Sequence, residues 1–223
     1  MNKKFITPQI KICGLTKIKQ AVECEKLGSN AIGLVFHPKS PRYIGAEKAK
    51  QITSALSEKT ITTGVFVNEK IDSVLKIIEK CKLKAVQLHG DESPAYTDQL
   101  IKKKIFVIKA LFIQKKPFIS DVSAYNASAY LIEYGKGSLP GGNALQWNWE
   151  KAKNFGTNHP LILAGGINAD NISDAAISAA PDAIDISSGV ETSPGNKNIL
   201  KVKEIINKLS DIKIAQRQLR RIF

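Results

Sequence analysis

The stretch that decides the fold is QIKICGLTKIKQAVECEKLGSNAIGLVF, residues 9–36. It begins and ends with short apolar runs rich in β-branched residues, a composition typical of buried strands. The segment between them, residues 17–27, has the spacing of a helix. A strand, a helix and a second strand in this order predict two parallel strands joined by a helical crossover.

The same unit recurs along the whole chain. Apolar runs begin at Gln9, Ala31, Ile61, Ala85, Phe106, Ala129, Leu161 and Ala183. Consecutive starts are 21 to 32 residues apart, and helical patterns such as residues 46–56 and 71–81 occupy the intervals. Eight units in about 200 residues match a minimal (β/α)8 barrel. A doubly wound open sheet is the alternative, but it more often has about five or six strands.

We therefore predict an α/β fold in which residues 1–223 form a single-domain (β/α)8 TIM barrel. A short N-terminal extension precedes the barrel, and a basic helical tail follows it from about residue 210. The helix after Phe112 is the least regular, because Pro117 and scattered serines interrupt its period.

The chain carries 33 basic and 20 acidic residues, a net charge of +13. A surplus of this size attracts anions, so nucleic acid has to be considered as a partner. The arginines are Arg42, Arg217, Arg220 and Arg221. All other basic residues are lysines, which read bases and phosphates less well than arginine does. A lysine-rich surface is the simpler explanation, and we expect no specific nucleic-acid partner.

Three sequence features bear on cellular location: membrane spans, signal peptides and disulfide frameworks. No apolar run reaches the 18 or so residues of a membrane span, and the N-terminus has no signal-peptide hydrophobic region. Three cysteines are too few for a disulfide framework. We expect a cytoplasmic protein without a membrane partner.

Polar side chains interrupt several of the predicted strands at a spacing of two. Residues two apart share one face of a strand, and in a barrel one face points inward. A polar group inside a barrel is costly unless it is paired or used. We expect these residues near the strand ends to carry chemistry. They are Lys11 and Cys13, Gln87 and His89, Asp185 and Ser187, with Lys109 and Glu133 on two further strands.

The last two units predict a phosphate site. Gly165 and Gly166 follow the seventh strand, where backbone amides can approach a ligand closely. Ser187, Ser188 and Gly189 follow the eighth strand, just before a possible short helix. Loops after the seventh and eighth strands often bind phosphate in barrels of this kind.

Six motifs resemble those of the N-(5'-phosphoribosyl)anthranilate isomerase family. They are KICGLT from Lys11, FHPKSPRYI from Phe36, GVFVN from Gly64, VQLHGDE from Val86, LAGGIN from Leu163 and IDISSGVE from Ile184. They occur in order over residues 10–209. The resemblance implies a (β/α)8 barrel without metal or cofactor. The implied reaction is the Amadori rearrangement of a small phosphorylated substrate in tryptophan biosynthesis, by a monomer or homodimer.

The resemblance also implies a general base and a general acid. The cysteine of KICG, Cys13, is the implied base, and the cation of Lys11 on the same strand face would lower the pKa of its thiol. Cys24 and Cys81 are expected to be ordinary core residues. The family's acid is an aspartate that ends the sixth strand, and here Glu133 stands in its place. The glutamate is one methylene longer, and a displacement of about 1 Å can cost about 100-fold in rate.

The loop after Glu133 departs from the family pattern as well, since Asn143-Ala144 replace Thr-Gly after two glycines. Among binding residues, Arg42 of SPRYI is the implied partner of the anthranilate carboxylate, a planar anion that suits a guanidinium. His89 either orients the substrate or is a satisfied core histidine. Asp185 either positions the serine loop or contacts the ribose hydroxyls.

One alternative function stays open. A binding protein on an isomerase-like barrel would use the basic surface and the tail, where Arg217, Arg220 and Arg221 could form a basic helix face. A related sugar-phosphate isomerase of histidine biosynthesis fits less well. Those barrels typically use paired aspartates, whereas the first strand here offers a cysteine.

Overall fold

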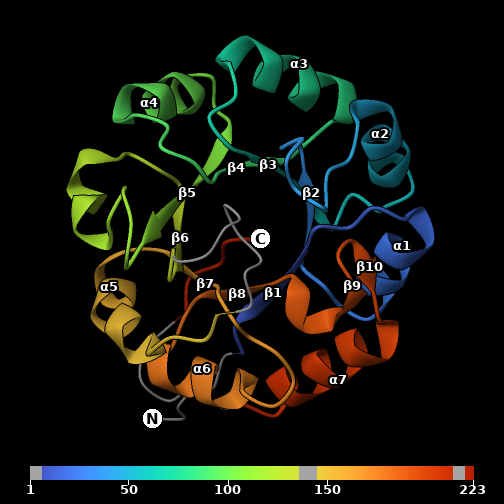
Figure 1. Ribbon diagram of the computed structural model, residues 1–223, viewed down its shortest axis with the longest axis vertical. Coiled ribbons are helices and arrows are strands. Elements are labelled where there is room, and N and C mark those ends of the chain that lie inside the picture. Colours follow the sequence, from blue (N-terminus) through green and yellow to red (C-terminus); the bar gives the residue numbers. More distant parts are fainter. Residues whose placement is uncertain (1–6, 136–144, 213–218) are drawn as a thin grey trace.

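Eight parallel strands close into a barrel in the computed structural model, which describes residues 7–135, 145–212 and 219–223. Neighbouring strands follow chain order, and the eighth strand pairs with the first, with Ile10 opposite Ile184 and Lys11 opposite Asp185. Helices surround the barrel on its outside (Figure 1). The prediction of a (β/α)8 barrel is confirmed, and the open sheet is excluded.

The barrel strands are β1 (Gln9–Cys13), β2 (Ala31–Val35), β3 (Ile61–Phe66), β4 (Ala85–Leu88), β5 (Phe106–Phe112), β6 (Ala129–Glu133), β7 (Leu161–Leu163) and β8 (Ala183–Ile186). The helices are α1 (Ile18–Lys26), α2 (Ala46–Ser54), α3 (Ile71–Cys81), α4 (Pro94–Lys102), α5 (Lys153–Asn158), α6 (Ile172–Ala179) and α7 (Ile199–Ser210). The 3-10 helices within the described ranges are η1 (Ile119–Ala124), η2 (Trp149–Ala152) and η3 (Ser188–Val190). A small hairpin outside the barrel consists of β9 (Glu191–Ser193) and β10 (Asn196–Lys197).

Every barrel strand begins at the residue where the apolar run begins. The expected irregularity after β5 is also present, because η1 occupies the place of an α-helix. Pro117 lies just before η1 and lacks the N–H group that a helix interior needs. The spacing of the apolar runs therefore predicted the strand positions correctly. Pro117 correctly indicated the connection, between β5 and β6, whose described part has no α-helix.

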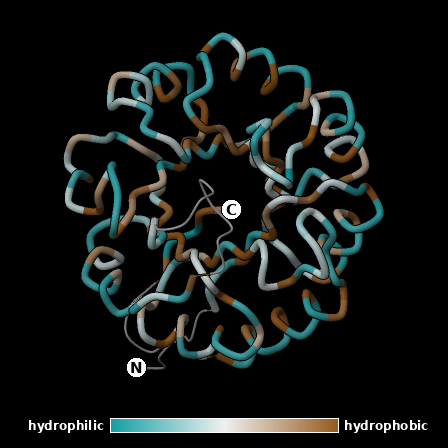
Figure 2. The backbone as a smooth tube through the Cα atoms, in the orientation of Figure 1, coloured by the Kyte–Doolittle hydropathy of each residue, from teal (hydrophilic) through white to brown (hydrophobic). Residues whose placement is uncertain are grey.

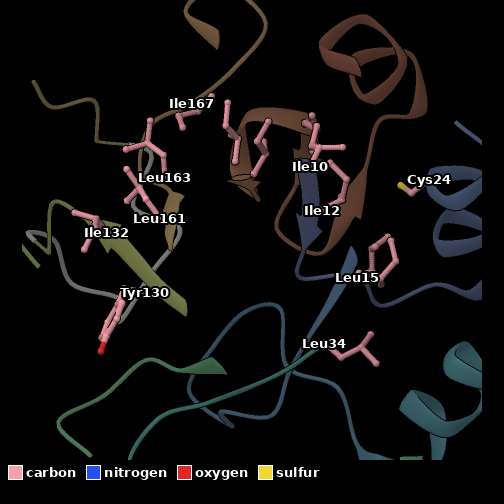
Figure 3. Packing of buried hydrophobic residues seen from close by; sticks show 14 of the residues in the cluster. Ile10, Ile12, Leu15, Cys24, Leu34, Tyr130, Ile132, Leu161, Leu163 and Ile167 are labelled. Atoms are coloured by element: carbon pink, nitrogen blue, oxygen red, sulfur yellow. The ribbon is translucent and has the colours of Figure 1, made fainter. Parts of the chain in front are cut away.

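The main core lies between the barrel and the helices. Outward-facing strand residues such as Ile10, Ile12 and Ile132 pack there against the helices (Figure 3). Figure 2 shows hydrophobic residues concentrated on the strands and on the inner sides of the helices, and hydrophilic residues on the rim. Cys24 and Cys81 are fully buried on α1 and α3, as expected of core residues.

A second core fills the barrel at its amino-terminal end. It combines the small first residues of strands, such as Ala31, Ala129 and Ala183, with Ile222 and Phe223 from the tail. The end of the chain accordingly lies at the centre of the barrel in Figure 1. The Gln9 amide fixes it there, because its oxygen accepts from the backbone N–H groups of Ile222 (2.6 Å) and Phe223 (3.0 Å).

The expectation of a basic helical tail is wrong for the described end of the chain. Residues 219–223 have no helical structure, and their apolar side chains are buried. Arg220 does not form part of a basic helix face. Its backbone N–H donates to Asp182, and its guanidinium pairs with the same carboxylate at 3.3 Å. Burial of three apolar residues outweighs the tendency of this basic segment to remain solvated. Gln216 and Arg217 lie outside the described residues.

The double substitution Ile222→Ala/Phe223→Ala is expected to destabilise the protein. Both side chains fill the barrel floor, so removing them costs on the order of 4 kcal/mol and lowers the melting temperature by roughly 10 °C. Thermal unfolding measures the change. The matched control is Arg221→Ala, which changes an exposed side chain. An equal melting temperature in both variants would show that the side chains of Ile222 and Phe223 contribute nothing to stability.

Lys109 does not point into the barrel, contrary to expectation. Ile108, Ala110 and Phe112 face inward on β5, so alternation sends Lys109 to the helix side. There its ammonium group pairs with the buried Glu92 carboxylate at 2.7 Å and donates to the Gly90 carbonyl. This pair braces the loop that follows β4.

Candidate active site

A pocket opens at the carboxyl ends of the strands. Its described wall combines a thiol, carboxyl groups, a histidine and an arginine with the loops after β7 and β8. The lining residues are Cys13, Val35, His37, Ser40, Arg42, Val65, Val67, Gln87, His89, Glu133, Ala164, Gly165, Gly166, Ile167, Asp185, Ile186, Ser187 and Ser188. Catalytic residues of (β/α)8 barrels lie at this end of the barrel.

Most of the predicted site residues therefore line one pocket. Gly189 is not part of the described wall but lies in the adjoining η3 turn. Lys11 lies deeper, where it is fully buried and its Nζ is 2.9 Å from Asp185 Oδ1. The expectation that Lys11 and Asp185 share the barrel interior is confirmed. Asn143 and Ala144 lie outside the described residues.

Cys13 ends β1 and projects into the pocket beside Val35 and Val65. The neighbouring strand makes room for it, because β2 has a glycine at the paired position, Gly33. A Cβ atom at Gly33 would lie 2.6 Å from Cys13 Sγ. Any residue other than glycine at position 33 would therefore displace the Cys13 thiol.

The electrostatic surroundings of Cys13 differ from the expected ones. Burial raises the pKa of the Cys13 thiol above its ordinary value. The Lys11 ammonium lowers this pKa, as expected, and Lys197 lowers it too, while the Asp185 carboxylate raises it. Burial prevails, so the group is a neutral thiol at neutral pH. The sequence predicted that Lys11 lowers the pKa of Cys13, but it did not reveal that burial raises this pKa by more.

Alkylation of Cys13 by iodoacetamide is expected to have its midpoint above pH 8.5. Only the thiolate reacts, and burial raises the pKa of this thiol above the ordinary value of about 8.5. The experiment uses the Cys24→Ala/Cys81→Ala background, in which Cys13 is the remaining cysteine. A midpoint at or below pH 7 would show that the cations prevail over burial.

Glu133 ends β6 across the barrel from Cys13 and is almost fully buried. One oxygen, Oε2, lies 3.1 Å from His89 Nε2. The other ring nitrogen, Nδ1, is 3.0 Å from Gln87 Nε2, an amide N–H donor, so Nδ1 accepts in this contact. The alignment of Nε2 with Glu133 falls outside hydrogen-bond geometry, so Nε2 is a buried group without a hydrogen-bond partner in the described part of the chain.

The extra methylene of Glu133 has a defined place. A Cβ atom at Gly165 would lie 3.2 Å from Glu133 Cγ, so the glutamate side chain extends along the loop after β7. Gly165 and Gly166 both adopt positive φ angles, of 96° and 69°. Trp147 anchors this loop through a hydrogen bond from Nε1 to the Ala164 carbonyl.

The two loops expected to bind phosphate lie side by side. A Cβ atom at Gly189 would lie 2.0 Å from the Ile167 carbonyl oxygen, so the loop after β8 packs directly on the loop after β7. The backbone N–H groups of Gly165 and Gly166 have no acceptor within residues 7–135, 145–212 and 219–223. The short helix expected here is η3, a single 3-10 turn. The Ser187 hydroxyl is partly engaged, since it donates to the Cys13 carbonyl at 3.1 Å.

Arg42 is buried at the pocket edge and is held by a residue that the sequence did not single out. Glu191 accepts from Arg42 Nε and Nη2 at 3.0 and 2.7 Å. Lys197, also missed, pairs with the same carboxylate at 2.7 Å. Glu191 is the last residue of the IDISSGVE motif. The one signal in the sequence that could have identified it is that a buried arginine needs a counterion.

Residues 7–135, 145–212 and 219–223 have neither the side-chain pattern of a metal site nor the helix pattern of a membrane span. Within them, no three histidine, cysteine, aspartate or glutamate side chains cluster in the way a metal ion requires. None of the described helices combines the length and apolar character of a membrane span.

Fold and site together define an enzyme of the (β/α)8-barrel class with its chemistry at the carboxyl ends of the strands. A family model for N-(5'-phosphoribosyl)anthranilate isomerase matches residues 10–208. The chain therefore belongs to the N-(5'-phosphoribosyl)anthranilate isomerase family and is an isomerase.

Individual relatives agree with this assignment. The chain is 46% identical to the N-(5'-phosphoribosyl)anthranilate isomerase of Desulfatibacillum aliphaticivorans, over 89% of this chain and 91% of the relative. It is 37% identical to that of Syntrophus aciditrophicus, over 89% and 85% of the two chains. The crystal structure of the Thermotoga maritima isomerase superposes with a TM-score of 0.84 at 32% identity, covering 92% of this chain and all of the other.

A second crystal structure shows a phosphoribosyl anthranilate isomerase in complex with reduced 1-(o-carboxyphenylamino)-1-deoxyribulose 5-phosphate. It matches with a TM-score of 0.81 at 32% identity, again over 92% of this chain and all of the other.

Proposed function

We propose that this chain converts N-(5'-phosphoribosyl)anthranilate to 1-(2-carboxyphenylamino)-1-deoxyribulose 5-phosphate in tryptophan biosynthesis. The observation that carries the proposal is one pocket lined by Cys13, Glu133 and Arg42 and by the glycine and serine loops. Membership of the family supports it, and so does the relative bound to the reduced form of the product.

Glu133 is the proposed general acid of the first step. The substrate ring opens when the bond between C1′ and the ring oxygen breaks and the oxygen takes a proton. The lone pair of the anilino nitrogen then forms a double bond to C1′. Glu133 supplies this proton from a carboxyl group whose Oε2 lies 3.1 Å from His89 Nε2.

Cys13 is the proposed general base of the second step. Its thiolate removes the proton from C2′, and the electron pair forms the C1′–C2′ double bond while the nitrogen becomes neutral. The C2′ hydroxyl then loses its proton and C1′ gains one, which gives the aminoketose. Because the pKa of Cys13 is raised by burial, the rate of this step increases as the pH rises above neutrality.

The two charged ends of the substrate have separate proposed partners. Arg42 binds the anthranilate carboxylate, because a guanidinium edge matches a planar carboxylate. The backbone amides of Gly165 and Gly166, with Ser187, Ser188 and Gly189, bind the phosphate. Asp185 keeps Lys11 in place beside Cys13 and lines the floor of the pocket.

The direct test is conversion of enzymatically generated substrate by the purified protein, followed by loss of anthranilate-type fluorescence. We also expect expression of the chain to restore growth of a tryptophan auxotroph that lacks this step. The Cys13→Ala variant is the control for contaminating host enzyme. A folded protein that neither converts the substrate nor restores growth would overturn the proposal.

Assembly and location belong to the same proposal. One solved relative is described as monomers generated from the dimeric Thermotoga maritima isomerase. We propose a cytoplasmic monomer or homodimer that needs no cofactor and no specific nucleic-acid partner. Size-exclusion chromatography with light scattering measures the oligomeric state.

A further inference from the structure

Glu191 is a buried carboxylate with two cationic partners. It begins β9, just after the loop that follows β8, and its side chain is 5% exposed. Oε2 accepts from Arg42 Nη2 at 2.7 Å. Oε1 accepts from Lys197 Nζ at 2.7 Å, from Arg42 Nε at 3.0 Å and from the Gly195 backbone N–H at 3.0 Å. These four hydrogen bonds to one carboxylate indicate a fixed geometry.

The contact with Glu191 determines which part of Arg42 faces the pocket. Nε and Nη2 are directed at Glu191, whereas Nη1 has no acceptor in the part of the chain that the structure describes. Arg42 lines the pocket, and Glu191 lies behind it, away from the wall. The outer edge of the guanidinium therefore remains available as a two-pronged donor for a carboxylate.

Lys197 connects the same carboxylate to the loop after β8. Its side chain is fully buried, and Nζ donates to the Ser187 carbonyl at 3.1 Å as well as to Glu191. The Arg42 side chain and the Ser187 hydroxyl both lie next to Gly14. A Cβ atom at Gly14 would lie 2.6 Å from Arg42 Cδ and 3.2 Å from Ser187 Oγ. Glu191 thus holds the arginine on one side and the serine loop on the other.

The charges in this cluster suit an anionic ligand. Two basic side chains flank one carboxylate, so the free edge of Arg42 presents positive charge to the pocket. Burial lowers the pKa of Lys197, and the Glu191 carboxylate counteracts this effect. Burial raises the pKa of Glu191. Hydrogen bonds and charge interactions with Arg42 and Lys197 lower it by more than burial raises it, so the pKa of Glu191 lies below its ordinary value. Glu191 is therefore ionised over the neutral range and holds both cations without a proton of its own.

We propose that Glu191 is a positioning residue that sets the carboxylate-binding edge of Arg42 and, through Lys197, the phosphate-binding loop at Ser187. One buried carboxylate thereby fixes the distance between the two ends of the substrate site. This inference rests on the proposed function, because it takes Arg42 and the serine loop as the groups that bind substrate.

The test compares Glu191→Gln with the wild type in steady-state kinetics. The amide cannot accept from both cations as the carboxylate does, so KM is expected to rise about 10- to 100-fold while kcat changes less than about threefold. Cys13 and Glu133 carry out the chemistry and are not touched. Glu204→Gln is the matched control, because Glu204 forms an exposed ion pair with Lys208 on α7.

Two inhibitors separate positioning from loss of a single contact. Anthranilate probes the carboxylate end, and ribose 5-phosphate probes the phosphate end. Glu191→Gln is expected to weaken competitive inhibition by both, whereas Arg42→Lys weakens inhibition by anthranilate alone. An effect of Glu191→Gln on anthranilate alone would overturn the proposed link to the serine loop.

Lys197→Met provides a second test of the link between Glu191 and the serine loop. If Glu191→Gln fails to fold, Lys197→Met is measured instead, and it is expected to raise KM and to weaken inhibition by ribose 5-phosphate. A lower melting temperature with unchanged KM and unchanged inhibition would show a structural role only and overturn the inference. An inactive but folded wild type would instead overturn the proposed function, so the two failures are distinguishable.

Discussion

Replacement of Cys13 by alanine is expected to lower kcat/KM about 1,000-fold, which is the usual size of a lost general base. The thiol stands at the pocket wall, and neither Cys24 nor Cys81 lines it, so no other thiol can remove the C2′ proton. The fold should tolerate the change, because only one sulfur atom is lost beside Val35 and Val65. Fluorescence assays measure the rate, and thermal unfolding confirms that the variant is folded.

The control for Cys13 is Cys24→Ala, which removes another buried thiol, on α1, without touching the pocket. We expect its rate to stay close to that of the wild type. A Cys13→Ala enzyme that retained a tenth of the activity or more would assign the base to another group. Asp185, which shares the pocket floor, would then be the residue to examine.

Glu133→Gln is expected to lower kcat about 100- to 1,000-fold, the effect of losing a general acid. The amide keeps the size of the side chain and its place against Gly165, but it cannot donate an acid proton to the ring oxygen. Burial and packing are unchanged, so KM should change little. Single-turnover measurements separate this loss from slower product release.

Glu133→Asp is the matched variant, because it restores the residue type that the family resemblance implies. It retracts the carboxyl group from His89 by one methylene, and we expect a rate between those of the wild type and Glu133→Gln. Equal loss in the two variants would show that the position of the carboxyl group, and not its proton, limits the reaction. A near-wild-type rate for Glu133→Gln would remove Glu133 from the mechanism.

The barrel could be predicted because its signal is periodic and local. Each β-branched run and each helical interval is visible within about 30 residues, and every run became a strand. Period two also predicted that Lys11 and Cys13 share a face. It could not say which alternate set faces inward on β5, where residues on both faces are apolar, and the interpretation of Lys109 was wrong for that reason.

Features that depend on distant contacts could not be predicted from the sequence. Glu191 and Arg42 are 149 positions apart, and the tail reaches Gln9 from 214 positions away. Spacing carries no information about such pairs. The net effect on the Cys13 pKa was also missed, because the sequence shows nearby charges but not the degree of burial that outweighs them.

The close approach between β1 and β2 has an evolutionary consequence. Gly33 has no side chain, and the Cys13 sulfur occupies the space that a Cβ atom would need. The two positions should therefore covary among homologous sequences: wherever position 33 gains a side chain, position 13 should hold something other than cysteine. A lineage that loses the thiol loses only the closest of these contacts, since the Cα and Cβ atoms of residue 13 would still lie 3.0 and 3.1 Å away. Substitutions at position 33 should therefore be small, and they should mark descendants that have given up this chemistry.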